Sequence, residues 1–184
     1  MFGKESMAHL SELEYLKFKR GVRVIMKNTF ISLTIYIASM MLGIFWYMLV
    51  AHLCYFSIRY FSFGAHLKNF WLCFIQSLAV FVFIPYLLIH HFPGLQLLYI
   101  GLFAGLVIWM IAPQPTKAQP IHEYMYQSLR TKTRMTVMMW LILSQLVPEV
   151  FSQMMLYGII IQAITLVITY MRRNSHVSFH SKSH

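Results

Sequence analysis

The sequence predicts an all-α integral membrane protein, and three observations lead to that class. Hydrophobic residues occupy 59% of the 184 positions and charged residues only 11%, whereas soluble domains average about 45–50% and about 25%. The apolar residues form long runs that short basic segments separate. The formal net charge is +10, and the basic residues flank the apolar runs. They therefore indicate membrane orientation and contact with anionic lipid, and argue against a nucleic-acid partner.

The chain is expected to form a single unit, 1–184, with an interfacial helix (1–28), a membrane region (29–171) and a cytoplasmic tail (172–184). Residues 5–28 interleave leucines with lysines and arginines. This pattern is typical of an amphipathic helix on the cytoplasmic membrane surface, and a soluble helix that docks another protein is the alternative. No cleaved signal peptide is expected.

About six membrane-embedded helical segments, arranged as hairpins, follow the interfacial helix. They are expected at 29–42, 44–60, 70–90, 95–112, 135–148 and 150–171. Gly43 divides the first hairpin, Pro85 is expected to kink the third segment, and Pro148-Glu149 marks the last turn. The polar loop 113–134 and the other basic segments then share one side, which the positive-inside rule assigns to the cytoplasm.

A short polar stretch between two of these segments, 59–73, carries the candidate chemistry. His66 could act as the base that activates the Cys73 thiol. The two residues are seven positions apart, or about 10.5 Å along a straight helix, so the chain must bend between them. Asn69 is a good N-cap and would place Cys73 in the first turn of a helix, where the helix dipole favours a thiolate. The spacing alone leaves a packed core cysteine as the alternative.

Other polar residues near the apolar runs have competing interpretations. Arg59 could be an interfacial anchor, or it could bind the substrate and shape the loop that follows. His52 and Cys54 form a rival pair, but they lie two positions apart on a helix and point in different directions, so core packing is preferred for both.

No metal and no cofactor are expected. The adjacent His90 and His91 have no further ligands near them in the sequence and mark a polar turn. His176, His180 and His184 recur every fourth residue, but the short tail that carries them is expected to be disordered.

The polar stretch resembles the AgrB (accessory gene regulator B) family, the membrane cysteine endopeptidases of peptide quorum sensing in Gram-positive bacteria. The matching residues there are Arg59, Gly64-Ala65-His66, Phe70-Trp71 and Cys73. Elsewhere the chain resembles the family at Lys27-Asn28, Ala112-Pro113, Thr116-Lys117, Pro120-Ile121 and 158–166. The family often has several lysines where this chain has Lys117-Ala118-Gln119, so only Lys117 remains of that run.

The resemblance implies that His66 and Cys73 are the catalytic pair, with Arg59, Gly64 and Lys117 as binding or supporting residues. It implies cleavage of an AgrD-like propeptide through a thioester and its cyclisation to a thiolactone or lactone, at the cytoplasmic face of the cell membrane. A homodimer is also suggested, although the sequence carries no motif for one. The rival function is a non-catalytic membrane protein, such as a transporter subunit or assembly partner.

Overall fold

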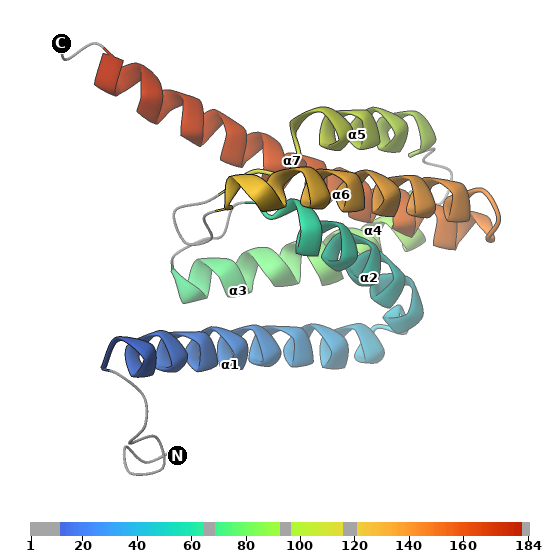
Figure 1. The fold of residues 1–184 in the computed structure, drawn as a ribbon. Coiled ribbons are helices and arrows are strands. Elements are labelled where there is room, and N and C mark those ends of the chain that lie inside the picture. The colour runs from blue at the N-terminus through green and yellow to red at the C-terminus, as the bar shows by residue number, and fades with distance from the viewer. Residues whose placement is uncertain (1–11, 65–68, 93–96, 116–120, 182–184) are drawn as a thin grey trace.

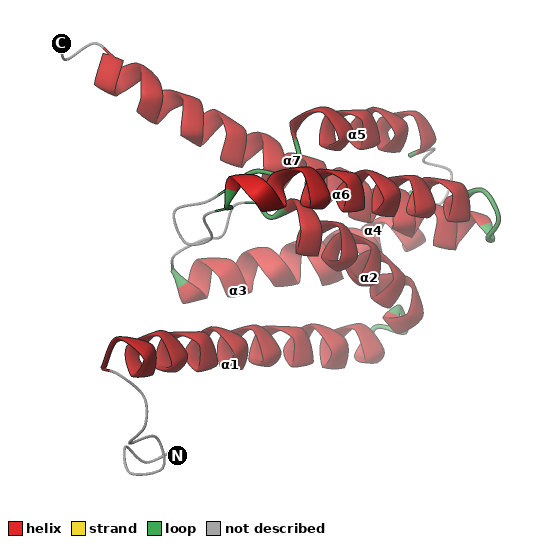
Figure 2. Cartoon of the chain, viewed as in Figure 1, coloured by secondary structure: helices red, strands yellow, loops and turns green. Residues whose placement is uncertain are grey.

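The computed structural model describes residues 12–64, 69–92, 97–115 and 121–181, and helices form almost all of this part of the chain (Figure 2). The elements in order are α1 (Glu12–Met41), α2 (Phe45–Ser62), α3 (Phe70–Leu78), the π-helical η2 (Ala79–Phe83), α4 (Ile84–His90), α5 (Leu98–Ile111), α6 (Glu123–Ser144) and α7 (Glu149–Ser181).

Three stretches of described helix are long and apolar enough to cross a membrane, namely Glu14–Met41, Phe70–His90 and Glu149–Arg172. Leu98–Ile111 is a shorter apolar helix. The all-helical, membrane-type fold is thus confirmed. Each of the six segments expected in the membrane falls largely within a helix, while their arrangement as six membrane-embedded hairpin arms stays a prediction.

Three helix boundaries differ from those expected. One continuous helix, α1, runs through the division placed between residues 28 and 29, because its sequence from there to Met41 contains neither proline nor glycine. The prediction of a polar loop over 113–134 is wrong for its second half, because α6 begins at Glu123. The carboxylate of Glu123 suits a helix N-terminus. The prediction of a disordered tail is also wrong, because α7 continues to Ser181. Neither proline nor glycine follows Arg172 to end the helix.

The helices are interrupted or distorted at the glycine and the proline where the sequence predicted it. Gly43 has a φ of 69° and separates α1 from α2. Pro85 has no N–H to donate, and the helix before it widens so that the Ile84 N–H bonds to the carbonyl of Ala79, five residues earlier. The Val80 carbonyl accepts a 2.7 Å hydrogen bond from the Tyr157 hydroxyl, which ties this widened segment to α7.

Helix α2 occupies the centre of the molecule (Figure 1), with α1 and α3 on one side and α5, α6 and α7 on the other. Its backbone approaches α7 closely, because a Cβ added to Gly158 would lie only 2.7 Å from the Ala51 carbonyl oxygen. Trp140 of α6 donates a 2.7 Å hydrogen bond to the Ser57 hydroxyl. Helix α2, whose C-terminal end begins the polar stretch, is therefore packed against α6 and α7.

Candidate active site

The chain leaves α2 through a backbone conformation that glycine tolerates and other residues rarely adopt. Phe63 has a φ of 61°, and Gly64, which is buried, has a φ of 130°. A Cβ on Gly64 would lie 3.1 Å from the Thr165 hydroxyl oxygen of α7. This position therefore requires glycine for its backbone angle and for space, which gives a physical basis for the supporting role expected of Gly64.

A glutamine on α7 holds this exit in place. Gln162 is fully buried, and its side-chain N–H donates to the Ser62 hydroxyl and to the Phe63 carbonyl, each at 2.7 Å. The Gln114 N–H donates to the Ser62 carbonyl at 3.1 Å. The segments that lead toward His66 and toward Lys117 therefore start side by side.

Asn69 begins α3, as predicted. Its side-chain oxygen accepts the Trp71 N–H at 2.9 Å, and its carbonyl accepts the Cys73 N–H at 3.1 Å. Cys73 thus lies in the first turn of the helix, half-buried and with a free thiol. This is the position that the N-cap signal in the sequence indicated.

Cys73 lines a cavity of about 140 Å³ between α1, α2, α3 and α7. The wall combines apolar side chains with several hydrogen-bonding ones. Its polar members are Asn28, Ser32, His52, Tyr55, Arg59, Cys73, Gln76, Ser77 and Thr165. A partly enclosed, mostly apolar space with a few polar groups around a thiol is the form that small binding sites commonly take.

Arg59 points its guanidinium at Tyr55, one turn earlier on α2. Its Nη1 donates a hydrogen bond to the Tyr55 hydroxyl oxygen, and its Cζ lies 5.4 Å from the centre of the same ring. Tyr55 and Cys73 line the same cavity. Arg59 and Tyr55 therefore form a hydrogen-bonded pair on the cavity wall, and Tyr55 is a residue that sequence reasoning missed. The signal was available, because residues four apart on a helix share a face.

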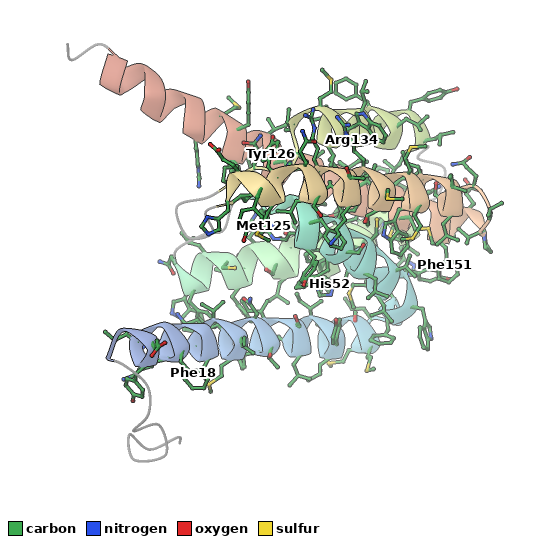
Figure 3. The ribbon with its side chains drawn as sticks, viewed as in Figure 1. Phe18, His52, Met125, Tyr126, Arg134 and Phe151 are labelled. Carbon is green, nitrogen blue, oxygen red and sulfur yellow. The ribbon has the colours of Figure 1, made fainter. Side chains whose placement is uncertain are left out.

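His52 and Cys54, the rival candidates for a catalytic pair, lie in two different environments. Cys54 is fully buried, and its thiol donates to the Met155 carbonyl at 3.2 Å, so its packing role is confirmed. His52 is also buried, with its ring centre 4.7 Å from that of Phe81 and its Nδ1 3.2 Å from the Tyr36 hydroxyl oxygen. In Figure 3 it lies between α2 and α1. It nevertheless lines the cavity that contains Cys73, which its position two helical turns before Arg59 could have indicated.

Two of the expected site residues, His66 and Lys117, lie outside the described residues. Arg59, Gly64 and Cys73 lie within them, and Arg59 and Cys73 share one cavity. Across the described ranges, no three His, Cys, Asp or Glu side chains gather as metal ligands. The geometry thus assembles a thiol, a tyrosine hydroxyl and a guanidinium, a set suited to acyl transfer at a cysteine.

Comparison with known proteins places the chain in a family. The family described as Accessory gene regulator B matches residues 2–166. The chain is 32% identical to the Accessory gene regulator protein B of Staphylococcus intermedius, over 86% of this chain and 85% of that protein. It is 37% identical to the protein of the same name from Staphylococcus saprophyticus, over 85% and 83%, and 35% identical to that of Staphylococcus aureus strain JH9, over 86% of each.

No solved structure matches the chain. The family match nevertheless covers most of the chain, including every residue that lines the cavity, and it confirms the family resemblance. The chain belongs to the accessory gene regulator B family.

Proposed function

We propose that the protein is a membrane cysteine endopeptidase that cleaves an AgrD-like propeptide and promotes its cyclisation for quorum sensing. One observation carries the proposal: of the two cysteines, Cys73 lies at the start of a helix on a cavity wall, whereas Cys54 is sealed in the core. The cavity gives a substrate access to the Cys73 thiol, which the core packing denies to Cys54.

The reaction begins with the Cys73 thiolate attacking the carbonyl carbon of the scissile peptide bond. A C–S bond forms, the C–N bond breaks, and His66 delivers a proton to the leaving amine. A cysteine or serine within the bound peptide then attacks the thioester, loses its proton to His66 and releases the Cys73 thiolate. The product is a cyclic thiolactone or lactone. Burial of the site at the membrane surface favours this ring closure because it limits the entry of competing water.

Tyr55 and Arg59 supply the hydrogen-bond donor that the reaction needs at the carbonyl oxygen. The N–H of Cys73 already bonds to the Asn69 carbonyl, so this group is not the donor in the described conformation. Arg59 donates to the Tyr55 oxygen, which makes the tyrosine hydroxyl a stronger donor toward a developing negative charge. Such a preorganised donor stabilises the transition state more than the substrate.

The site is proposed to face the cytoplasm of a Gram-positive cell, in a protein that crosses the cell membrane several times. Basic side chains from three helices lie at the Cys73 end: Lys27 over the Phe70 ring at 5.5 Å, Lys132 over the Phe61 ring at 5.9 Å, and Arg59. The described turns at the opposite end, 42–44, 91–92 and 145–148, contain no lysine or arginine. This asymmetry follows the positive-inside rule and suits anionic lipid and an acidic propeptide tail.

The supporting roles of Gly64 and Lys117 belong to the same proposal. Gly64 directs the chain from α2 toward His66, and Lys117 binds the propeptide from the cytoplasmic loop. A homodimer belongs to the same proposal, and the oligomeric state measured in detergent tests it.

The experiment that tests this function compares wild type with Cys73→Ala, His66→Ala and Cys54→Ala in proteoliposomes that contain an AgrD-like propeptide. Mass spectrometry follows C-terminal cleavage and the ring product. Cleavage is expected to disappear in the first two variants and to persist in Cys54→Ala, which serves as the matched control. Cleavage at the wild-type rate by Cys73→Ala would refute the proposed nucleophile and favour a non-catalytic membrane role.

A further inference from the structure

The cavity beside Cys73 extends past the thiol toward the middle of the membrane region. Three helical stretches, α1, α2 and α3 continued by η2, each contribute one residue at the level of the thiol and another one seven or eight positions away, which is about 10–12 Å at the helical rise. The upper set is Asn28, Arg59 and Cys73, and the lower set is Ile35, His52 and Phe81. The cavity therefore has a polar mouth and a deeper, mostly apolar end.

The side chains at the lower end are buried and packed against one another. Ile35, His52 and Phe81 are all buried. The Tyr36 hydroxyl fixes the His52 ring through its Nδ1 at 3.2 Å, and the Phe81 ring packs against it at a centroid distance of 4.7 Å. Among the described residues, no lysine, arginine, aspartate or glutamate lines this lower end, and the Nδ1 of its one histidine is already engaged by Tyr36. A charged group placed there would therefore lose its hydration without gaining an ion-pair partner among those four residue types.

The size of the cavity suits a single side chain. Its volume is about 140 Å³, and an engineered apolar cavity of about 150 Å³ in another protein holds one benzene molecule. A backbone does not fit such a space beside a side chain, whereas an aromatic ring or a long aliphatic chain does.

We propose that this cavity is the pocket for the side chain of the residue whose carbonyl Cys73 attacks, and that it selects an uncharged, bulky apolar side chain. The inference rests on the proposed function, because it takes Cys73 as the nucleophile. The pocket then serves two purposes: it sets which peptide bond is cut, and it holds the acyl group against Cys73 while the peptide closes its ring.

Two small residues halfway down the cavity allow the pocket to be filled from opposite walls. Ser32 lies on α1, four residues beyond Asn28, and Ser77 lies on α3, four residues beyond Cys73. Leucine at either position would block the lower end and leave the thiol at the mouth open. Thr29→Leu is the matched control, because Thr29 is exposed on α1 and does not line the cavity.

The probes are iodoacetamide, which has no side chain, and the chloromethyl ketones of N-acetylated alanine, phenylalanine and aspartate. Alkylation of Cys73 is followed by intact-mass spectrometry in proteoliposomes, with Cys54→Ala as the background. The phenylalanine reagent is expected to react at least tenfold faster than the other two ketones. Ser32→Leu and Ser77→Leu should each abolish this preference without changing the iodoacetamide rate, and Thr29→Leu should retain it.

Equal rates for the three ketones at a Cys73 that reacts with iodoacetamide would refute the pocket and leave the peptidase proposal intact. A preference that persists in both filling variants would also refute it, because the side chain would then be recognised elsewhere or by lipid partitioning. A Cys73 that reacts with none of the four reagents would refute the proposed nucleophile, and the pocket with it. Since the two filling variants lie on different helices, a misfolded one leaves the other to decide.

Discussion

Gly64 offers the sharpest test of how the end of α2 is built, through the single change Gly64→Ala. The residue has a φ of 130°, outside the range that a side chain with a Cβ adopts at low energy. The new Cβ would lie 3.1 Å from the Thr165 hydroxyl oxygen. That hydroxyl cannot easily withdraw, because it donates to the Gln162 carbonyl at 2.9 Å and lies 3.0 Å from the Gln162 side-chain oxygen.

Two other glycines allow the magnitude to be worked out from the same structure. Gly43 has a φ of 69° but open space around it. Gly43→Ala should therefore lower the free energy of unfolding only by the strain of a left-handed backbone, about 1–2 kcal/mol. Gly21 lies within α1, also with open space, so Gly21→Ala should stabilise the protein by about 0.5–1 kcal/mol. Gly64→Ala combines an unfavourable φ with a tight contact and should cost about 2–4 kcal/mol.

The free energy of unfolding in mixed micelles and the rate of propeptide cleavage are measured for all three variants. Gly64→Ala should be the least stable and should lose at least tenfold in cleavage, because Gly64 directs the chain toward His66. Gly43→Ala and Gly21→Ala should cleave at near the wild-type rate. The reasoning is refuted if Gly64→Ala costs no more stability than Gly43→Ala.

Three further substitutions test the contacts around the site. Gln162→Leu leaves the Ser62 hydroxyl and the Phe63 carbonyl without their donor, so the free energy of unfolding should fall by about 2–4 kcal/mol; an unchanged value would show that the contact is dispensable. Asn69→Ala removes the cap of α3 and should cost about 1 kcal/mol, with slower alkylation of Cys73 by iodoacetamide; an unchanged rate would contradict the link between cap and thiol. Gly158→Ala places a Cβ 2.7 Å from a backbone oxygen of α2, and monodisperse protein should be lost on size-exclusion chromatography; normal elution and stability would contradict the close packing of α2 and α7.

Local signals in the sequence were sufficient to predict a structural feature where a single residue type determines the backbone conformation. Gly43 separates α1 from α2, and Asn69 caps α3 as its side chain allows. The widened helix before Pro85 follows in the same way from a missing N–H. These features depend on neighbours along the chain, so they can be predicted without knowing the fold.

The helix ends and the cavity depend on information that local signals lack. The tail of α7 continues to Ser181 because nothing stops it, and a missing stop signal is easily taken for disorder. The contact between Gln162 and Ser62 joins residues 100 positions apart. The shared cavity of His52 and Cys73 likewise needs α1, α2 and α3 packed together. Pairing across helices is set by packing, which no periodicity in a single helix encodes.

The most direct test of the central claim is to trap the thioester on Cys73. Wild-type protein in proteoliposomes is mixed with an AgrD-like propeptide, quenched in acid within seconds and analysed by intact-mass spectrometry. The account predicts an added mass equal to the N-terminal part of the propeptide, located on Cys73, removed by hydroxylamine and absent in Cys73→Ala. Cleaved propeptide with no adduct on Cys73, and with Cys73→Ala as active as wild type, would contradict it.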